Sequence, residues 1–220
     1  MARTDDLNLR QDVLDELEWD PSIDARSIGV GVEDGIVTLT GHVSTYSEKF
    51  DAEKITKRVY GVRGVANELE VRIPATAERD DADIARSAAD ALEWSASIPR
   101  DRIKVSVTKG WVTLDGEVDW YYQKRAAEDT VRGLKGVRGV TNKILLKPVM
   151  ARIADVRSKI EAALKRNAEL DAKRIDVQAS DGSVTLSGTV HSWVERDDAL
   201  NAAWSAPGVT TVIDQIRIQP

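Results

Sequence analysis

Apolar residues recur in three stretches of the chain at the four-residue spacing that one face of a helix presents to a core. An alternating apolar and polar segment follows each stretch, at 28–32, 103–107 and 175–177, and this alternation is typical of a half-buried strand. The pattern predicts a helix followed by a strand, three times over. The apolar helix positions are Leu9, Val13, Leu17, Ile84, Ala88, Leu92, Val156, Ile160 and Leu164.

A tight turn, a second strand, a second helix and a last strand complete each stretch. Asp34-Gly35, Lys109-Gly110 and Asp181-Gly182 predict the turns of hairpins, because glycine tolerates the positive φ that such turns require. Capping-box patterns at 45–48 and 192–195 predict the start of the second helix. We expect this helix to end at a glycine, and the last strand to cover 69–73, 144–146 and 216–218. The glycines at the expected helix ends are Gly61, Gly136 and Gly208.

The three stretches are copies of one unit. The segments 35–43, 110–118 and 182–190 all read G-x-V-T-L-x-G-x-V, and a Gly-Val block follows 26 residues after the start of each. The copies are offset by 75 and 72 residues, so the chain is three homologous units of about 70 residues.

The predicted fold class is therefore α+β, with three tandem αββαβ units at 5–74, 80–148 and 152–220. In each unit we expect two helices to pack on a three-stranded mixed sheet. A domain of this size is marginal alone, so contacts between units should help to stabilise it. The short joints permit either a compact cluster or a bent rod.

These motifs resemble the BON domain, named for bacterial osmotically induced periplasmic and nodulation proteins, and the resemblance covers essentially the whole chain. It implies a small non-enzymatic module of stress-response or envelope proteins, proposed to bind phospholipid surfaces. The third unit departs from the pattern with Asp214 and with Ala206-Pro207 before its glycine. The repeat signature consists of Gly35, Gly41, Gly61, Asn67, Gly110, Gly116, Gly136, Asn142, Gly182, Gly188 and Gly208.

The sequence predicts no catalytic residue, metal site or cofactor. Cysteine is absent, and His42 and His191 fall at different positions of the repeat. No carboxylate pair recurs among the units, so acid–base catalysis has no anchor. The net charge of −6 argues against a nucleic-acid partner.

Division of the charge singles out the second unit. Residues 1–75 carry a net charge of −6, residues 76–149 a charge of +1 and residues 150–220 a charge of −1. The second unit also combines aromatic and basic residues, a combination that suits an anionic membrane interface. The candidate contact residues are Trp111, Trp120, Tyr122, Lys124, Arg125, Arg132 and Lys135.

Other aromatic residues have equivalents in other units, which favours packing roles. We expect Trp94, like Trp19, to pack at a helix end, and Tyr121 to share a packing role with its equivalents Tyr46 and Trp193.

The expected function is weak, non-catalytic binding to anionic phospholipid. The alternative is a chaperone-like stress protein that binds polypeptides at exposed sheet edges or grooves between units. A small-molecule or ion sensor, whose units close on a ligand, has no sequence support beyond the short joints. Without a leader or membrane span the chain reads as cytoplasmic; if a leader has been removed, it would be periplasmic. The oligomeric state is left open.

Overall fold

The computed structural model describes residues 2–147, 153–167 and 172–219, and these residues form three αββαβ units. The predicted α+β class is confirmed. The expected unit boundaries at 148, 152 and 220 lie outside the described residues.

The first unit contains α1 (Ala2–Trp19), β1 (Ile28–Glu33), β2 (Ile36–Val43), α2 (Tyr46–Arg58), β3 (Gly64–Asn67) and β4 (Glu70–Val71). The second contains α3 (Asp81–Trp94), β5 (Ile103–Thr108), β6 (Trp111–Val118), α4 (Tyr121–Arg132), β7 (Gly139–Asn142) and β8 (Leu145–Leu146). The third contains α5 (Ile153–Arg166), β9 (Ile175–Ser180), β10 (Ser183–Val190), α6 (Trp193–Trp204) and β11 (Thr211–Ile218).

The middle strand of each sheet is the second strand of the hairpin. In the first unit β2 pairs antiparallel with β1 and parallel with β3 and β4, and β6 and β10 hold the same place in the other units. The sheets are therefore mixed, as predicted.

Two expected element boundaries were wrong. The second helices end at Arg58, Arg132 and Trp204, and the glycines expected to stop them lie in the turn that follows, with φ of 94°, 89° and 84°. The last strand begins earlier than predicted, because its ladder with the middle strand already starts opposite Ile36, Trp111 and Ser183. In the first two units it is also interrupted, after Asn67 and Asn142.

Each unit encloses its own hydrophobic core between helices and sheet. The nine apolar helix positions predicted from the four-residue spacing are all buried. The inward residues of the middle strand meet them, among them Val37 and Leu39, which are completely buried. Full burial of such a side chain stabilises a fold by about 1.5–3 kcal/mol.

The predicted hairpin turns are confirmed. Both turn residues have positive φ in each unit, for example 50° at Asp34 and 75° at Gly35. Two of these turns are stabilised by side-chain hydrogen bonds that the sequence did not predict. The carboxylate of Asp6 accepts hydrogen bonds from the amides of Asp34 and Gly35 at 3.0 and 3.1 Å. Asp81 does the same in the second unit and so ties the start of α3 to the hairpin.

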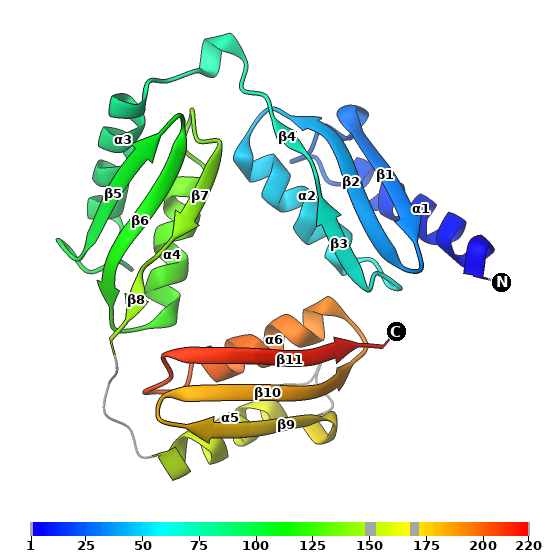
Figure 1. Cartoon of the computed structure of the whole chain (residues 1–220), viewed down its shortest axis with the longest axis vertical. Helices are drawn as coiled ribbons and strands as arrows, with labels where there is room; N and C mark the ends of the chain where they lie inside the picture. The colour runs from blue at the N-terminus through cyan, green and yellow to red at the C-terminus, as the bar shows by residue number, and fades with distance from the viewer. Residues whose placement is uncertain (1, 148–152, 168–171, 220) are drawn as a thin grey trace.

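The three units form a closed triangle (Figure 1), so the compact alternative is the observed one. The edges formed by β3–β4, β7–β8 and β11 face the middle of the triangle, and β1, β5 and β9 lie on its outside (Figure 1). The second helices α2, α4 and α6 meet near the middle, and α2 contacts α6 although the first and third units are not neighbours in the chain.

Candidate functional site at the junction of the three units

An aromatic residue in the first turn of each second helix packs onto the next unit. Tyr46 of α2 lies against the core of the second unit, and Trp193 of α6 lies against the core of the first. Tyr121 of α4 stacks on Trp204 of the third unit, with ring centroids 4.2 Å apart and planes 8° from parallel. The three residues occupy one repeat position, so the shared packing expected for them takes the form of a contact between units.

Three residues of one repeat position, at the end of the second helix, receive aromatic contacts from another unit. Lys57 Nζ lies 4.8 Å from the centre of the Trp193 ring, and Trp204 stacks on Tyr121. The third, Arg132, lies over the ring of Phe50 at 3.4 Å, four residues after Tyr46. The start of each second helix therefore meets the end of the next, and the series closes on itself. A head-to-tail contact that closes after three copies gives a ring.

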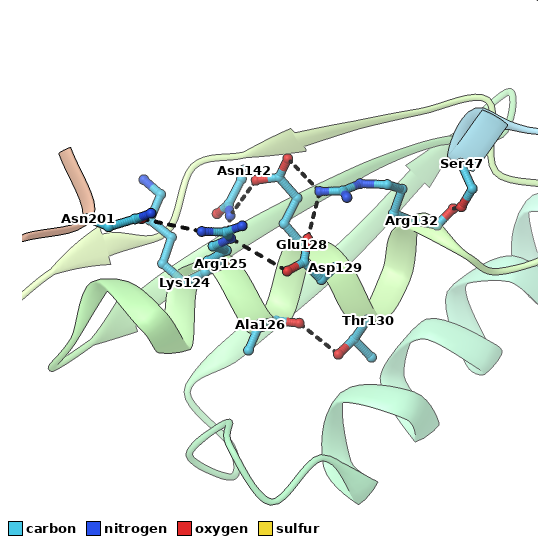
Figure 2. A network of polar contacts seen from close by, with 10 residues as sticks. All are labelled: Ser47, Lys124, Arg125, Ala126, Glu128, Asp129, Thr130, Arg132, Asn142 and Asn201. Atoms are coloured by element: carbon cyan, nitrogen blue, oxygen red, sulfur yellow. Dashed lines mark hydrogen bonds and ion pairs between the residues drawn. The ribbon is translucent and has the colours of Figure 1, made fainter. Parts of the chain in front are cut away.

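Arg132 is a largely enclosed cation of this junction, with 14% of its side chain exposed, and its polar contacts are drawn in Figure 2. Its Nη2 lies 2.7 Å from Asp129 Oδ1, and its Nε is buried without a partner among the described residues. Its carbonyl oxygen accepts a hydrogen bond from Ser47 Oγ at 3.5 Å, which links α2 to the end of α4.

Two cavities lie where the helices meet. One of about 300 Å³ is lined by residues of all three second helices, including Lys124, Arg125 and Arg132. The second, of about 440 Å³, lies between Trp193 and the α2 side chains Glu53 and Lys57. Three cations that the sequence suggested for a membrane surface thus converge on a junction between units.

The enclosure shifts the proton affinity of several groups at the junction. Burial lowers the pKa of Lys124, whose Nζ donates to the carbonyl of Ile144 at 2.7 Å. Burial raises the pKa of the Asp197 carboxyl, against the opposing charges of Lys57, Arg196 and Arg125. At Glu53 burial acts in the same direction, but the hydrogen bond and charge of Lys57, 2.6 Å away, hold its pKa below the usual value.

The other predicted contact residues lie elsewhere. Trp111 is 49% exposed on the sheet face of the second unit, where its ring covers Gly139 and its Nε1 donates to Thr141 Oγ1 at 2.8 Å. Trp120 is half-buried at the start of α4. Tyr122 is 58% exposed in the first turn of α4, and Lys135 is exposed after that helix.

The expectation that Trp19 and Trp94 pack at helix ends was wrong. They are 84% and 88% exposed, at equivalent positions at the ends of α1 and α3. The signal was present in the spacing, because each follows the last buried leucine of its helix by two residues. Two residues correspond to about 200° around a helix, which is the side away from the core.

Signature residues that recur among the three units have structural roles. A Cβ at Gly116 would lie 2.0 Å from the carbonyl oxygen of Arg102, so the backbone leaves no room for a side chain there. Asn142 accepts a hydrogen bond from the amide of Ile144 and donates to the carbonyl of Lys124. Asn67 makes the equivalent bonds in the first unit.

Within residues 2–147, 153–167 and 172–219, no helix is both long and apolar enough to cross a bilayer. Nor do the described His, Asp and Glu side chains form a group of three or more that could hold a metal ion.

Comparison with known proteins agrees with the repeat. The BON domain model matches residues 5–73, 80–148 and 153–220. Osmotically-inducible protein Y of Escherichia coli is 31% identical over 132 residues, which cover 57% of this chain and 65% of that protein. The match thus spans just under two thirds of the relative's length.

Solved structures give only a remote likeness. Two structures of CdsD, a structural protein of the type III secretion system of Chlamydia trachomatis, match 97% of the chain at 14% identity and a TM-score of 0.28. One covers 93% and the other 98% of the solved chain. Three matched segments that together span nearly the whole sequence place the chain in the BON domain family, as a protein of three tandem BON domains distantly related to osmotically-inducible protein Y.

Proposed function

We propose that the protein is a non-catalytic, stress-related binding protein that attaches weakly to anionic phospholipid surfaces through the helix side of its second unit. The observation that carries the proposal is the exposure of Trp94, 88% open to water at the end of α3. A large aromatic side chain of this kind is stabilised at the level of lipid headgroups, where its ring leaves water.

Comparison of the repeat positions favours the second unit over the first. Trp19 shares a hollow with Tyr60, with the acidic side chains Asp12, Asp15 and Glu16, and with Arg58, which lies 3.1 Å from Glu16. At the positions equivalent to the three acids and Arg58 the second unit holds Ser87, Asp90, Ala91 and Gly133, and Lys135 stands at the position of Tyr60. The formal charge of these positions is therefore zero in the second unit against −2 in the first, and an anionic surface attracts the added cation by about 1 kcal/mol.

Flotation with vesicles tests this proposal. The protein should float with vesicles that contain phosphatidylglycerol and not with pure phosphatidylcholine vesicles. Trp94→Ala and Lys135→Glu should each reduce flotation severalfold, while Trp19→Ala and the sheet-face variant Trp111→Ala should float like the parent. Equal behaviour of both vesicle types, or undiminished flotation of Trp94→Ala, would exclude this surface.

The second candidate is a polypeptide-binding stress protein, and the outer edges of the sheets favour it. Along β1, β5 and β9 the described residues show pairing on one side only, so each strand presents backbone groups to which an extended chain could add. Suppression of the aggregation of an unfolded client, by a protein that floats with neither vesicle type, would support this alternative.

A further inference from the structure

Three side chains at one repeat position of the junction are chemically different from one another. Phe50 of α2, Arg125 of α4 and Asp197 of α6 are related by the 75- and 72-residue offsets of the repeat. All three line both cavities at the meeting point of the helices. An apolar ring, a cation and a carboxylate, each from a different unit, therefore face the same space.

Three other charged side chains near this space have close partners. Lys57 lies 2.6 Å from Glu53, Arg132 lies 2.7 Å from Asp129, and Arg196 is held by Asp214 at 2.7 Å. Each of these ion pairs lies within one unit. The charge of these side chains is therefore largely compensated by partners within their own unit.

Arg125 and Asp197 differ from these paired groups. Among the described residues, Arg125 makes two long polar contacts, at 3.4 Å to Asn201 Oδ1 and 3.8 Å to Asp129 Oδ2 (Figure 2), and 56% of its side chain is exposed. Within the described part of the chain, Asp197 accepts no side-chain hydrogen bond and forms no ion pair. The two groups influence each other electrostatically and line the same two cavities, but no nitrogen of Arg125 lies within 4.0 Å of a carboxylate oxygen of Asp197.

We propose that the junction of the three units binds a small zwitterion with an apolar body, such as a betaine or an aliphatic α-amino acid. Its carboxylate binds the guanidinium of Arg125, whose planar fork matches two carboxylate oxygens. Its ammonium group lies against the Asp197 carboxylate, and its apolar part lies against the part of the Phe50 ring that the Arg132 guanidinium does not cover. Cavities of about 300 and 440 Å³ fall within the range of small-molecule sites.

The site requires all three units, because each supplies one of the recognition groups. A bound zwitterion would connect α4 to α6 and cover α2, and it would therefore stabilise the closed triangle. This proposal does not depend on lipid binding, which involves Trp94 on a different part of the second unit.

Titration calorimetry on the full chain tests the proposal, with glycine betaine and L-leucine as probes at low millimolar concentration. We expect saturable binding of at least one probe at one site per chain. Sodium acetate and tetramethylammonium chloride, which carry only one of the two charges, should bind about tenfold more weakly or not at all. A thermal-unfolding scan should show a midpoint that rises with the logarithm of the probe concentration above the Kd, whereas a solute that acts by exclusion from the surface raises the midpoint in proportion to its concentration.

Variants identify the site. Arg125→Gln and Asp197→Asn should each weaken binding about tenfold or more, since each removes one charged hydrogen-bond partner. The matched charge changes Lys104→Gln and Asp115→Asn, on the outer sheet face of the second unit, should bind like the parent. Absence of saturable binding of both probes, or equal binding by Arg125→Gln and the controls, would overturn the proposal, and circular dichroism would establish that each variant is folded.

Discussion

Arg196 and Asp214 form an ion pair in the third unit, with Nε and Nη2 of the arginine both 2.7 Å from Oδ2 of the aspartate. The equivalent positions of the first unit hold Lys49 and Asn67, which do not bond to each other through their side chains. Lys49 Nζ instead donates to the carbonyl of Leu69 at 2.7 Å. The third unit thus departs from the repeat signature at Asp214 and, together with it, at Arg196. Asp214 still accepts a hydrogen bond from the amide of Ile216, as Asn67 does from the amide of Leu69.

Asp214→Asn should lower the free energy of unfolding of the third unit by about 1–3 kcal/mol, because it leaves a half-buried arginine without its anion. The double variant Arg196→Lys, Asp214→Asn recreates the pair found in the first two units and should recover most of the loss. Urea unfolding of the full chain, followed by the near-ultraviolet circular dichroism of its tryptophans, measures both. A double variant no more stable than Asp214→Asn would show that the two positions are independent.

Asp81→Ala should destabilise the second unit by about 1–3 kcal/mol, because two turn amides lose their acceptor. Asp83→Ala is the matched control. Asp83 pairs with Arg86 on the surface, with 52% and 68% of the side chains exposed, and such a pair contributes about 0–1 kcal/mol. Equal effects of the two substitutions in denaturant unfolding would contradict the role assigned to the contact between Asp81 and the hairpin.

Trp193→Ala should open the triangle between the first and third units while each unit stays folded. The indole is the aromatic contact of α6 with the first unit, and Lys57 and Arg196 lie over its ring at 4.8 and 4.6 Å. Small-angle X-ray scattering should show a larger radius of gyration with unchanged circular dichroism. Trp94→Ala, which removes an exposed tryptophan, should leave the scattering profile as it is; an unchanged profile for Trp193→Ala as well would mean that other contacts close the triangle.

As far as the Asp197 carboxyl determines it, the closed triangle should lose stability as the pH rises from 3.8 through the raised pKa of this group. Burial raises the pKa of this carboxyl above its ordinary value of 3.8, so the closed state favours the protonated form. Its cost to stability is absent below pH 3.8, sets in as the pH rises through the raised pKa, and stays constant above it. Lys57 from α2, Arg125 from α4 and Arg196 from α6 moderate the effect, whereas the neighbouring carboxylate of Asp198 adds to it.

Asp197→Asn should abolish this component of the pH dependence and make the closed state more stable at neutral pH. Scattering and unfolding experiments over the same pH range, with parent and variant side by side, measure the difference. A variant that retains the pH dependence of the parent would show that another group is responsible.

Much of the fold was predictable because it rests on local patterns. Helix periodicity placed Val13 and Ile160 in the core, and Asp-Gly pairs placed the hairpin turns. The ends of the second helices were missed because the glycines act one turn later, where the chain reverses into the last strand. The exposure of Trp94 could have been read from its position two residues after Leu92, on the outer side of the helix.

Three copies of one unit were predictable from the sequence alone, since a repeat with fixed internal spacing places the same elements and the same core in each copy. The sequence also indicated Arg125 and Arg132 as candidate membrane-contact residues of the second unit. That these residues meet two other units is visible only in the folded chain. Contacts such as Tyr121 on Trp204, or Lys57 on Trp193, join equivalent repeat positions with different side chains, and no periodicity along the chain encodes them. The ring closes where the units are complementary in shape and charge. Residues predicted for a membrane surface therefore lie at a junction between units.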